Sequence, residues 1–500
     1  MVKPSIIIST ISAATAGLSF LNQVVVASLF GTTQQMDVYL VATSLPLMVS
    51  GILCGGLNFA LVPLLSAGVS SSSSTGQVRR NVLKATILIC VVVSGVGAAA
   101  ADPVIRTFLG KFPEHVIAEG IWLHRISWLT AAFLIAGAYF VALHNANRRF
   151  FLAALSAVIP YAAMLATIVL FGSAIGVRSI ALGMLLGSAA AVIILFASAS
   201  GELGLRGTNR GEENKVVRSF LRNLPFLMTG MLTFAAYPLV DAFWAARLGE
   251  GAVSYLGYAQ RILIAIGGLV VAGPFAILAT KFVETEREGT RRFNEAMLAS
   301  LSWLLVVLSP TALILAVLGD PIVMILLQRG QFTADSTRYV GTLLLLMSPG
   351  MVAMLCGTIL FRGFFARNDY RSPALIGVLW TAAYFGLAGT LSTFMGVSGL
   401  AVAYSVVWVL TLVLGFRLFL REDFKKLFMW RKAAYVSKLA VSIAITFVTM
   451  QEVRDLLMDP SESYAMISLI TRAAVTAFIA LVVFGLVSWK ILKIVPPRST

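Results

Sequence analysis

Long apolar stretches alternate with short polar connections along the whole chain. Fourteen such stretches can be distinguished, and each exceeds the roughly 20 residues that a helix needs to cross a bilayer. The pattern predicts an all-α polytopic membrane protein. The two widest stretches are expected to include an interfacial turn at one end. The predicted spans are 5–30, 36–66, 81–102, 120–144, 149–172, 177–199, 219–247, 252–281, 293–318, 336–365, 372–394, 397–420, 432–453 and 465–492.

Composition supports this prediction. Hydrophobic residues make up 59% of the 500 residues and charged residues only 12%, and a soluble protein of this length could not bury so much apolar surface. The first apolar stretch continues as a span, so it is not interpreted as a cleavable signal peptide.

The basic residues define an expected orientation. With the N-terminus inside, 28 of the 38 Lys and Arg residues lie in inner segments, seven lie in outer segments and three lie within spans. Short cytoplasmic loops carry such an excess. Both termini are therefore predicted to be cytoplasmic. The net charge of +16 is interpreted as topology plus contact with anionic headgroups, with no nucleic-acid partner.

An internal duplication is visible at an offset of 220 residues. The segment 176–181 (GVRSIA) recurs at 396–401 (GVSGLA), and each copy joins two predicted spans. A similar offset relates Leu29–Gly31 to Arg247–Gly249. Six spans per copy predict two lobes in parallel repeat around a central cavity, with two further helices after them. The expected division is 1–216 for the N-terminal lobe, 217–430 for the C-terminal lobe and 431–500 for the last two helices.

No motif for bond-making chemistry is present. The sequence contains no P-loop and no zinc-protease motif, so a transporter is expected and an enzyme is not. No cofactor or metal is predicted, although dependence on a coupling cation or on the membrane potential stays open. Packing or hydrogen bonding near the membrane interfaces is expected for His115, His124 and His144. Burial without metal or disulfide is expected for Cys54, Cys90 and Cys356.

Polar residues within spans are the candidate binding residues, because a charge in the bilayer costs roughly 2.5–3.5 kcal/mol on insertion scales and normally faces protein or water. Arg261 lies about nine residues into its span, where its guanidinium suits bidentate binding of a diphosphate. A structural ion pair with Asp241 is the alternative, and both roles can hold together.

Other polar candidates are weaker. Asp37 is expected to cap the N-terminus of the second span. Asn22 and Asn58 could line a cavity or form interhelical hydrogen bonds. Arg362 could meet a headgroup or anchor its helix. Snorkelling toward the outer surface is expected for Arg125 and Arg472.

Four motifs in order resemble the MurJ/MviN lipid II flippase family. They are Phe30-Gly31 through Asp37–Ala42 with Leu61-Val62-Pro63; Val240-Asp241 through Arg247–Ser254 and Tyr258–Arg261; Gln328–Thr333; and Arg362–Asp369 with Ser372-Pro373. The resemblance implies a fold of two six-helix lobes plus two helices in the bacterial inner membrane. It also implies movement of undecaprenyl-diphosphate-linked saccharides to the periplasmic leaflet by alternating access, with Arg261 matching a diphosphate-binding arginine.

The chain departs from this family pattern at its cationic positions. The two first-helix arginines align with Ala16 and Asn22, the second-helix arginines fall around Ser50-Gly51, and the acidic-glycine pair reads Gly55-Gly56. Lipid II and another lipid-linked repeat unit therefore both stay open as substrates. A cation-coupled exporter of amphiphilic molecules, titrating Asp37 or Asp241, is one alternative function. A scaffold for glycan-assembly enzymes that transports nothing is another.

Overall fold

The computed structural model describes residues 2–67, 74–199, 229–287, 289–367, 369–420, 431–458 and 466–492, and every regular element within these ranges is a helix. Twelve of the described helices are long and apolar enough to cross a membrane. Residues 219–228 of the predicted span 219–247 lie outside the described residues, and its described part contains α10 (Tyr237–Ala245). The predicted span 432–453 is helical, but Lys438 and Glu452 lie along it. The expected all-α membrane fold is confirmed.

The helices fall into two compact units, each described here by itself. The first comprises Met1–Ser254 with Arg329–Phe332, and the second comprises Tyr255–Gln328 with Thr333–Thr500. This division is by contact and places the boundary later than residue 216. The expected division at residues 216 and 430 stays a prediction.

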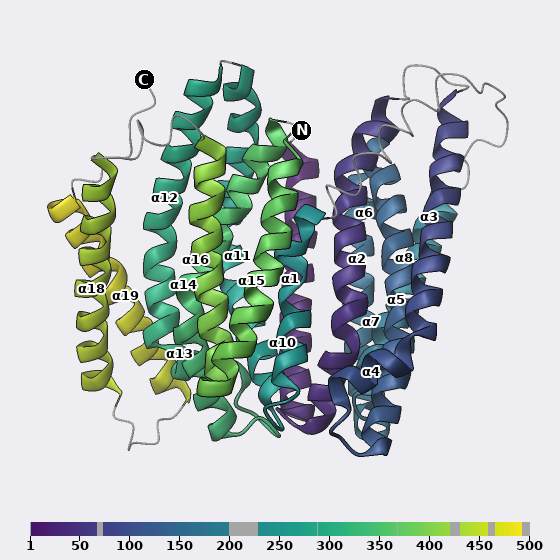
Figure 1. Cartoon of the computed structure of the whole chain (residues 1–500), viewed down its shortest axis with the longest axis horizontal. Helices are drawn as coiled ribbons and strands as arrows, with labels where there is room; N and C mark the ends of the chain where they lie inside the picture. Colours follow the sequence, from purple (N-terminus) through teal and green to yellow (C-terminus); the bar gives the residue numbers. More distant parts are fainter. Residues whose placement is uncertain are drawn as a thin grey trace. The chain divides into compact units, whose positions relative to one another are not determined.

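The first unit contains most of the N-terminal half (Figure 1). Its helices are α1 (Val2–Phe30), α2 (Gln34–Ala67), α3 (Ser74–Ala99), α4 (Ala101–Leu109), α5 (Glu114–Ala146), α6 (Phe150–Ser156), α7 (Val158–Ile175), α8 (Arg178–Ala199) and α10 (Tyr237–Ala245). Helix α5 packs against α2, α3 and α8, and α1 packs against α7. The core at these contacts includes Leu53, Tyr139 and Leu195.

The second unit begins within α11. Its helices are α11 (Ala252–Arg287), α12 (Thr290–Val317), α13 (Gly319–Leu327), α14 (Ala334–Ala366), α15 (Arg371–Met395), α16 (Val397–Leu420), α18 (Arg431–Leu457) and α19 (Met466–Leu492). Helix α14 packs against α12, α13 and α16, while α18 and α19 pack on each other and on α12. Of the α14 span, 72% is buried, which makes α14 the centre of this unit.

The two units repeat the same packing scheme. The pairs α3–α5, α4–α5, α5–α8 and α7–α8 of the first unit correspond to α12–α14, α13–α14, α14–α16 and α15–α16 of the second. The turns identified in the sequence match in geometry, because Gly176 has φ 58° and ψ −141° and Gly396 has φ 58° and ψ −136°. In each turn this glycine donates to the carbonyl four residues earlier at 3.0 Å, that of Gly172 or Ser392. These left-handed turns explain why glycine recurs there.

The repeat also preserves one side-chain hydrogen bond with its partners exchanged. On α3, Arg79 donates to Asn147 Oδ1 after α5 at 2.8 Å. In the second unit Asn294 lies on α12, and Arg367 after α14 donates to its Oδ1 at 2.5 Å. The Arg367 guanidinium also lies 4.1 Å from the ring centroid of Phe419. In the first unit the arginine lies on α3 and the asparagine follows α5, whereas in the second unit the asparagine lies on α12 and the arginine follows α14.

The hydrogen bond between Arg367 and Asn294 is expected to stabilise the fold measurably. Asn294→Ala removes one charge-assisted bond of the half-buried Arg367, which contributes about 1.5–3 kcal/mol, whereas the bond from Arg367 to the Phe419 carbonyl at 3.1 Å remains. A double-mutant cycle of Asn294→Ala and Arg367→Ala, read from thermal unfolding in detergent, should give a coupling free energy of that size. Additive effects of the two substitutions would contradict the assignment.

Several details differ from the sequence expectations. The stretches 36–66 and 336–365 lie within continuous helices, α2 and α14, so the expected interfacial turns are wrong. The stretch 149–172 is instead broken between α6 and α7. Pro160 explains this break, because its ring would clash with the carbonyl of Ser156. The connections 103–119 and 319–335 include all of α13 and most of α4, the two short helices that match between the units.

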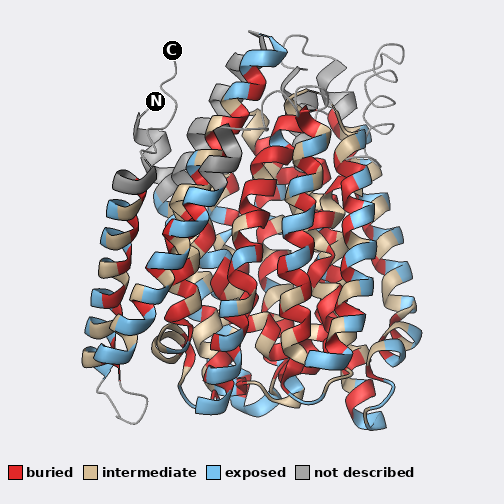
Figure 2. Ribbon diagram, turned by 60° about the vertical axis from the view of Figure 1, so that its left-hand side comes forward, coloured by how far each residue is buried: buried red, intermediate tan, exposed pale blue. Residues whose placement is uncertain are grey.

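Apolar side chains cover the outer faces of several helices. Buried and exposed residues alternate around the helices in Figure 2, yet many exposed residues are aliphatic. Val91 on α3 and Leu170 on α7 are 65% and 69% exposed. Exposed apolar surface of this extent is typical of helices that contact lipid.

Candidate functional site

The turn between α1 and α2 is a point of close backbone approach within the first unit. Gln331 donates its backbone N–H to the carbonyl of Ser28 at 2.9 Å. A Cβ on Gly31 would lie 2.3 Å from the Gln331 carbonyl oxygen, and one on Gly330 would lie 2.2 Å from the Ser28 oxygen. Both glycines have positive φ, 53° and 58°. Only glycine fits at these two positions.

Asp37 binds the other segment that reaches this turn. Its buried carboxylate accepts hydrogen bonds from Gly251 N at 2.6 Å, Ser254 N at 2.8 Å and Ser254 Oγ at 2.5 Å. Gly251 and Ser254 form the N-terminus of α11, whose unpaired N–H groups favour an anion. The expectation that Asp37 caps its own helix is wrong, because both carboxylate oxygens face the N-terminus of α11. We call this contact the Asp37 cap.

These contacts all lie within the first unit, close in sequence to the points where the chain leaves or re-enters it. Those points follow residues 254, 328 and 332. Asp37 binds Gly251 and Ser254, and the Ser28 carbonyl accepts from Gln331 in the segment 329–332. The backbone N–H of Gln34 adds a hydrogen bond to Glu250 Oε1 at 3.0 Å. The α1–α2 turn therefore holds two segments of the first unit that are distant from it in sequence.

The strongest sequence candidate, Arg261, lies on α11 in the second unit. Its side chain is half-buried, and its guanidinium carbon lies 5.9 Å from the ring centroid of the buried Tyr258. A cation held over an aromatic face at this distance is stabilised by the ring. Asp241 is buried on α10 in the first unit, so the expected Arg261–Asp241 ion pair stays a prediction.

The remaining candidates differ in what surrounds them. Asn22 is fully buried and its amide donates to Leu18 O and to Tyr161 O on α7, both at 2.9 Å. Of its two expected roles, the structure supports the interhelical hydrogen bond. Asn58 lies in α2, but its side chain is outside the described residues. Arg362 lies on α14 and is exposed, as either expected role requires.

Two residues form contacts that the sequence did not specify, His124 and Arg472, which were expected to hydrogen-bond or pack near an interface and to snorkel, respectively. His124 joins α5 to α2, with Nδ1 2.6 Å from Ala42 O and Nε2 accepting from Trp128 Nε1 at 3.0 Å. This network assigns the proton to Nδ1. Arg472 donates to the carbonyl of Leu457 at the end of α18, so it joins α18 to α19. The sequence alone does not identify these contacts, because each depends on which residue of another helix lies beside the side chain.

Among the described residues, no three His, Cys, Asp or Glu side chains lie close enough to hold a metal ion. Cys54, Cys90 and Cys356 are free thiols.

The chain matches a family model across most of its length. The model describes the lipid II flippase MurJ, and it matches residues 26–474. A probable lipid II flippase MurJ from Rhizobium meliloti (strain 1021) is 28% identical over 432 residues, which cover 81% of this chain and 79% of that protein. A probable lipid II flippase MurJ from Thermotoga maritima is 24% identical over 391 residues, covering 78% and 79%.

Solved structures show the same fold. A lipid II flippase MurJ in an inward closed conformation matches with a TM-score of 0.77, covering 98% of this chain and all of that one at 17% identity. An inward-facing multidrug resistance MATE family transporter matches with a TM-score of 0.69 over 81% of this chain and 93% of that one, at 14% identity. At these identities the structures establish the architecture alone. Together with the family model, they show that this chain belongs to the lipid II flippase MurJ family.

Proposed function

We propose that this chain is a flippase that moves lipid II, an undecaprenyl-diphosphate-linked saccharide, across the bacterial cytoplasmic membrane for peptidoglycan synthesis. The observation that carries the proposal is the family match over residues 26–474. The twelve apolar helices are long enough to form the path through the membrane. Both termini are proposed to be cytoplasmic, which the distribution of basic residues supports.

The proposed transport cycle is alternating access. The substrate enters from the inner leaflet, and the two units rearrange so that the headgroup leaves on the outer side. The Asp37 cap and the glycine contact at Ser28 lie within the first unit, and they would keep the α1–α2 turn in place while the units rearrange.

Substrate roles follow from residue chemistry. Arg261 would bind the diphosphate, because a guanidinium donates two parallel hydrogen bonds to phosphate oxygens. Asp241, Asn58 and Arg362 would shape the headgroup site. Asn22 would act by holding α1 on α7. With Ala16 and Asn22 at the family's arginine positions, Arg261 would contribute a larger share of the phosphate affinity than in relatives with more arginines.

The experiment that tests this function is depletion of the protein in its own cells, followed by identification of the lipid-linked precursor that accumulates. Accumulation of lipid II is expected, with growth restored by the wild-type chain. Accumulation of another undecaprenyl-linked glycan would replace lipid II by that repeat unit. Unchanged precursor pools would contradict a flippase and favour the exporter or the scaffold.

A further inference from the structure

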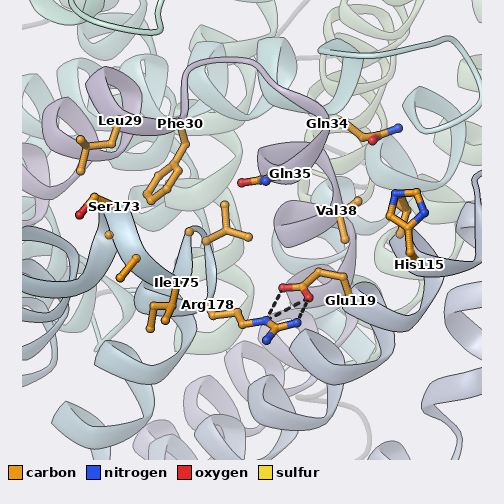
Figure 3. Close-up of a pocket in the computed structure, with 15 residues that line it drawn as sticks. Leu29, Phe30, Gln34, Gln35, Val38, His115, Glu119, Ser173, Ile175 and Arg178 are labelled. Atoms are coloured by element: carbon orange, nitrogen blue, oxygen red, sulfur yellow. Dashed lines mark hydrogen bonds and ion pairs between the residues drawn. The ribbon is translucent and has the colours of Figure 1, made fainter.

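The first unit contains a polar pocket. Its volume is about 700 Å³, within the range of small-ligand sites. Its walls are the α1–α2 turn, the first turns of α5 and the α7–α8 turn (Figure 3). In the proposed orientation these three segments lie on the outer side of the membrane.

The charges in this pocket cancel each other. Arg178 binds Glu119 through two nitrogen atoms, with Nε 2.8 Å from Oε1, and Figure 3 shows this pair at one side of the pocket. The Arg178 guanidinium carbon also lies 5.2 Å from the ring centroid of Trp122. A phosphate or a metal ion would have to break this fixed pair, so the pocket favours a neutral ligand.

Unused hydrogen-bonding capacity lies opposite this pair. Neither the Gln34 nor the Gln35 carboxamide has a hydrogen-bond partner among the described residues, and both line the pocket. A Cβ on Gly176 would lie 3.2 Å from Gln35 Oε1, so this carboxamide reaches toward the α7–α8 turn. Phe30 and Val38 supply an apolar wall. Carboxamides both donate and accept, as the hydroxyl and acetamido groups of a sugar do.

We propose that this pocket binds a neutral saccharide unit, and that it receives the substrate's sugar after translocation. The choice of a saccharide rests on the proposed function, whereas the neutral, hydrogen-bonding character rests on the pocket itself. Gln34 and Gln35 belong to the same turn as Asp37, and the Gln34 backbone N–H donates to Glu250. A sugar bound there contacts the α1–α2 turn.

The test uses the full chain in lipid nanodiscs and a soluble disaccharide of N-acetylglucosamine as the probe, with binding measured by saturation-transfer NMR and titration. The wild-type chain should bind the probe. Gln35→Leu should weaken binding about tenfold, which corresponds to the loss of one to two hydrogen bonds. Gln451→Leu, at an exposed glutamine of α18, is the matched control and should bind as the wild type does.

The outcomes separate this inference from the proposed function. Absence of probe binding to the wild-type chain, or equal binding by Gln35→Leu, overturns the pocket assignment even where depletion causes lipid II to accumulate. Binding that Gln35→Leu weakens, with unchanged lipid II on depletion, supports the pocket and overturns the proposed substrate. Thermal unfolding of Gln35→Leu at the wild-type temperature excludes a folding defect, because the side chain is exposed.

Discussion

Replacement of Asp37 by alanine is expected to abolish transport while the protein still inserts into the membrane. The substitution removes the acceptor for Gly251 N, Ser254 N and Ser254 Oγ together. Each buried donor left without a partner costs about 1–3 kcal/mol, and the N-terminus of α11 also loses its compensating charge. The measurement is growth of a strain depleted of its own lipid II flippase, together with the amount of variant protein in the membrane.

A matched cap elsewhere provides the control. Asp369 accepts from Ser372 N at 3.1 Å and from Ser372 Oγ at 2.7 Å, so it caps α15 with the same chemistry as Asp37. Asp369→Ala should retain growth, because this cap joins residues three positions apart in the second unit, whereas the Asp37 cap joins residues more than 210 positions apart. Ser254→Ala removes one of three donors and should have an intermediate effect. Growth of Asp37→Ala at the wild-type rate would show that the Asp37 cap is not needed for transport.

The lengths of the apolar stretches were sufficient to predict most of the long helices of this protein. Spans such as 177–199 and 397–420 match α8 and α16 closely, because each begins directly after a glycine turn visible in the sequence. The break between α6 and α7 was missed although Pro160 marks it. The interfacial turns expected in α2 and α14 were wrong because length alone does not require a break, since a long helix can tilt or extend beyond the bilayer.

The site was less predictable than the fold. Asp37 was a candidate, but its partners Gly251 and Ser254 lie more than 210 residues away. No local sequence pattern predicts a pairing over such a distance. The same holds for Arg178, which appeared only as an outer-loop charge until Glu119 was placed beside it. Gly31 and Gly330 carried a usable signal, because glycine in a motif outside a helix often marks close backbone approach.

Arg261 has the second large expected effect. A guanidinium ten residues into α11 raises the cost of membrane insertion by roughly 2.5–3.5 kcal/mol, so Arg261→Ala should insert at least as well as the wild-type chain. Its proposed role is different: two charge-assisted hydrogen bonds to the diphosphate, each contributing about 1.5–3 kcal/mol. Because the positions of the other family arginines are occupied by Ala16 and Asn22, few cationic groups remain to compensate.

Arg261→Ala is therefore expected to abolish growth of the depleted strain and to cause lipid II to accumulate, with normal protein in the membrane. Binding of undecaprenyl diphosphate to the purified chain in nanodiscs should weaken at least about tenfold, the change that 1.4 kcal/mol produces. Arg261→Lys keeps the positive charge but loses the planar guanidinium that donates two parallel hydrogen bonds, so partial function is expected. Arg125→Ala, at an exposed arginine within the span of α5, is the control and should behave as the wild type. Wild-type growth of Arg261→Ala with unchanged diphosphate affinity would remove Arg261 from the substrate site.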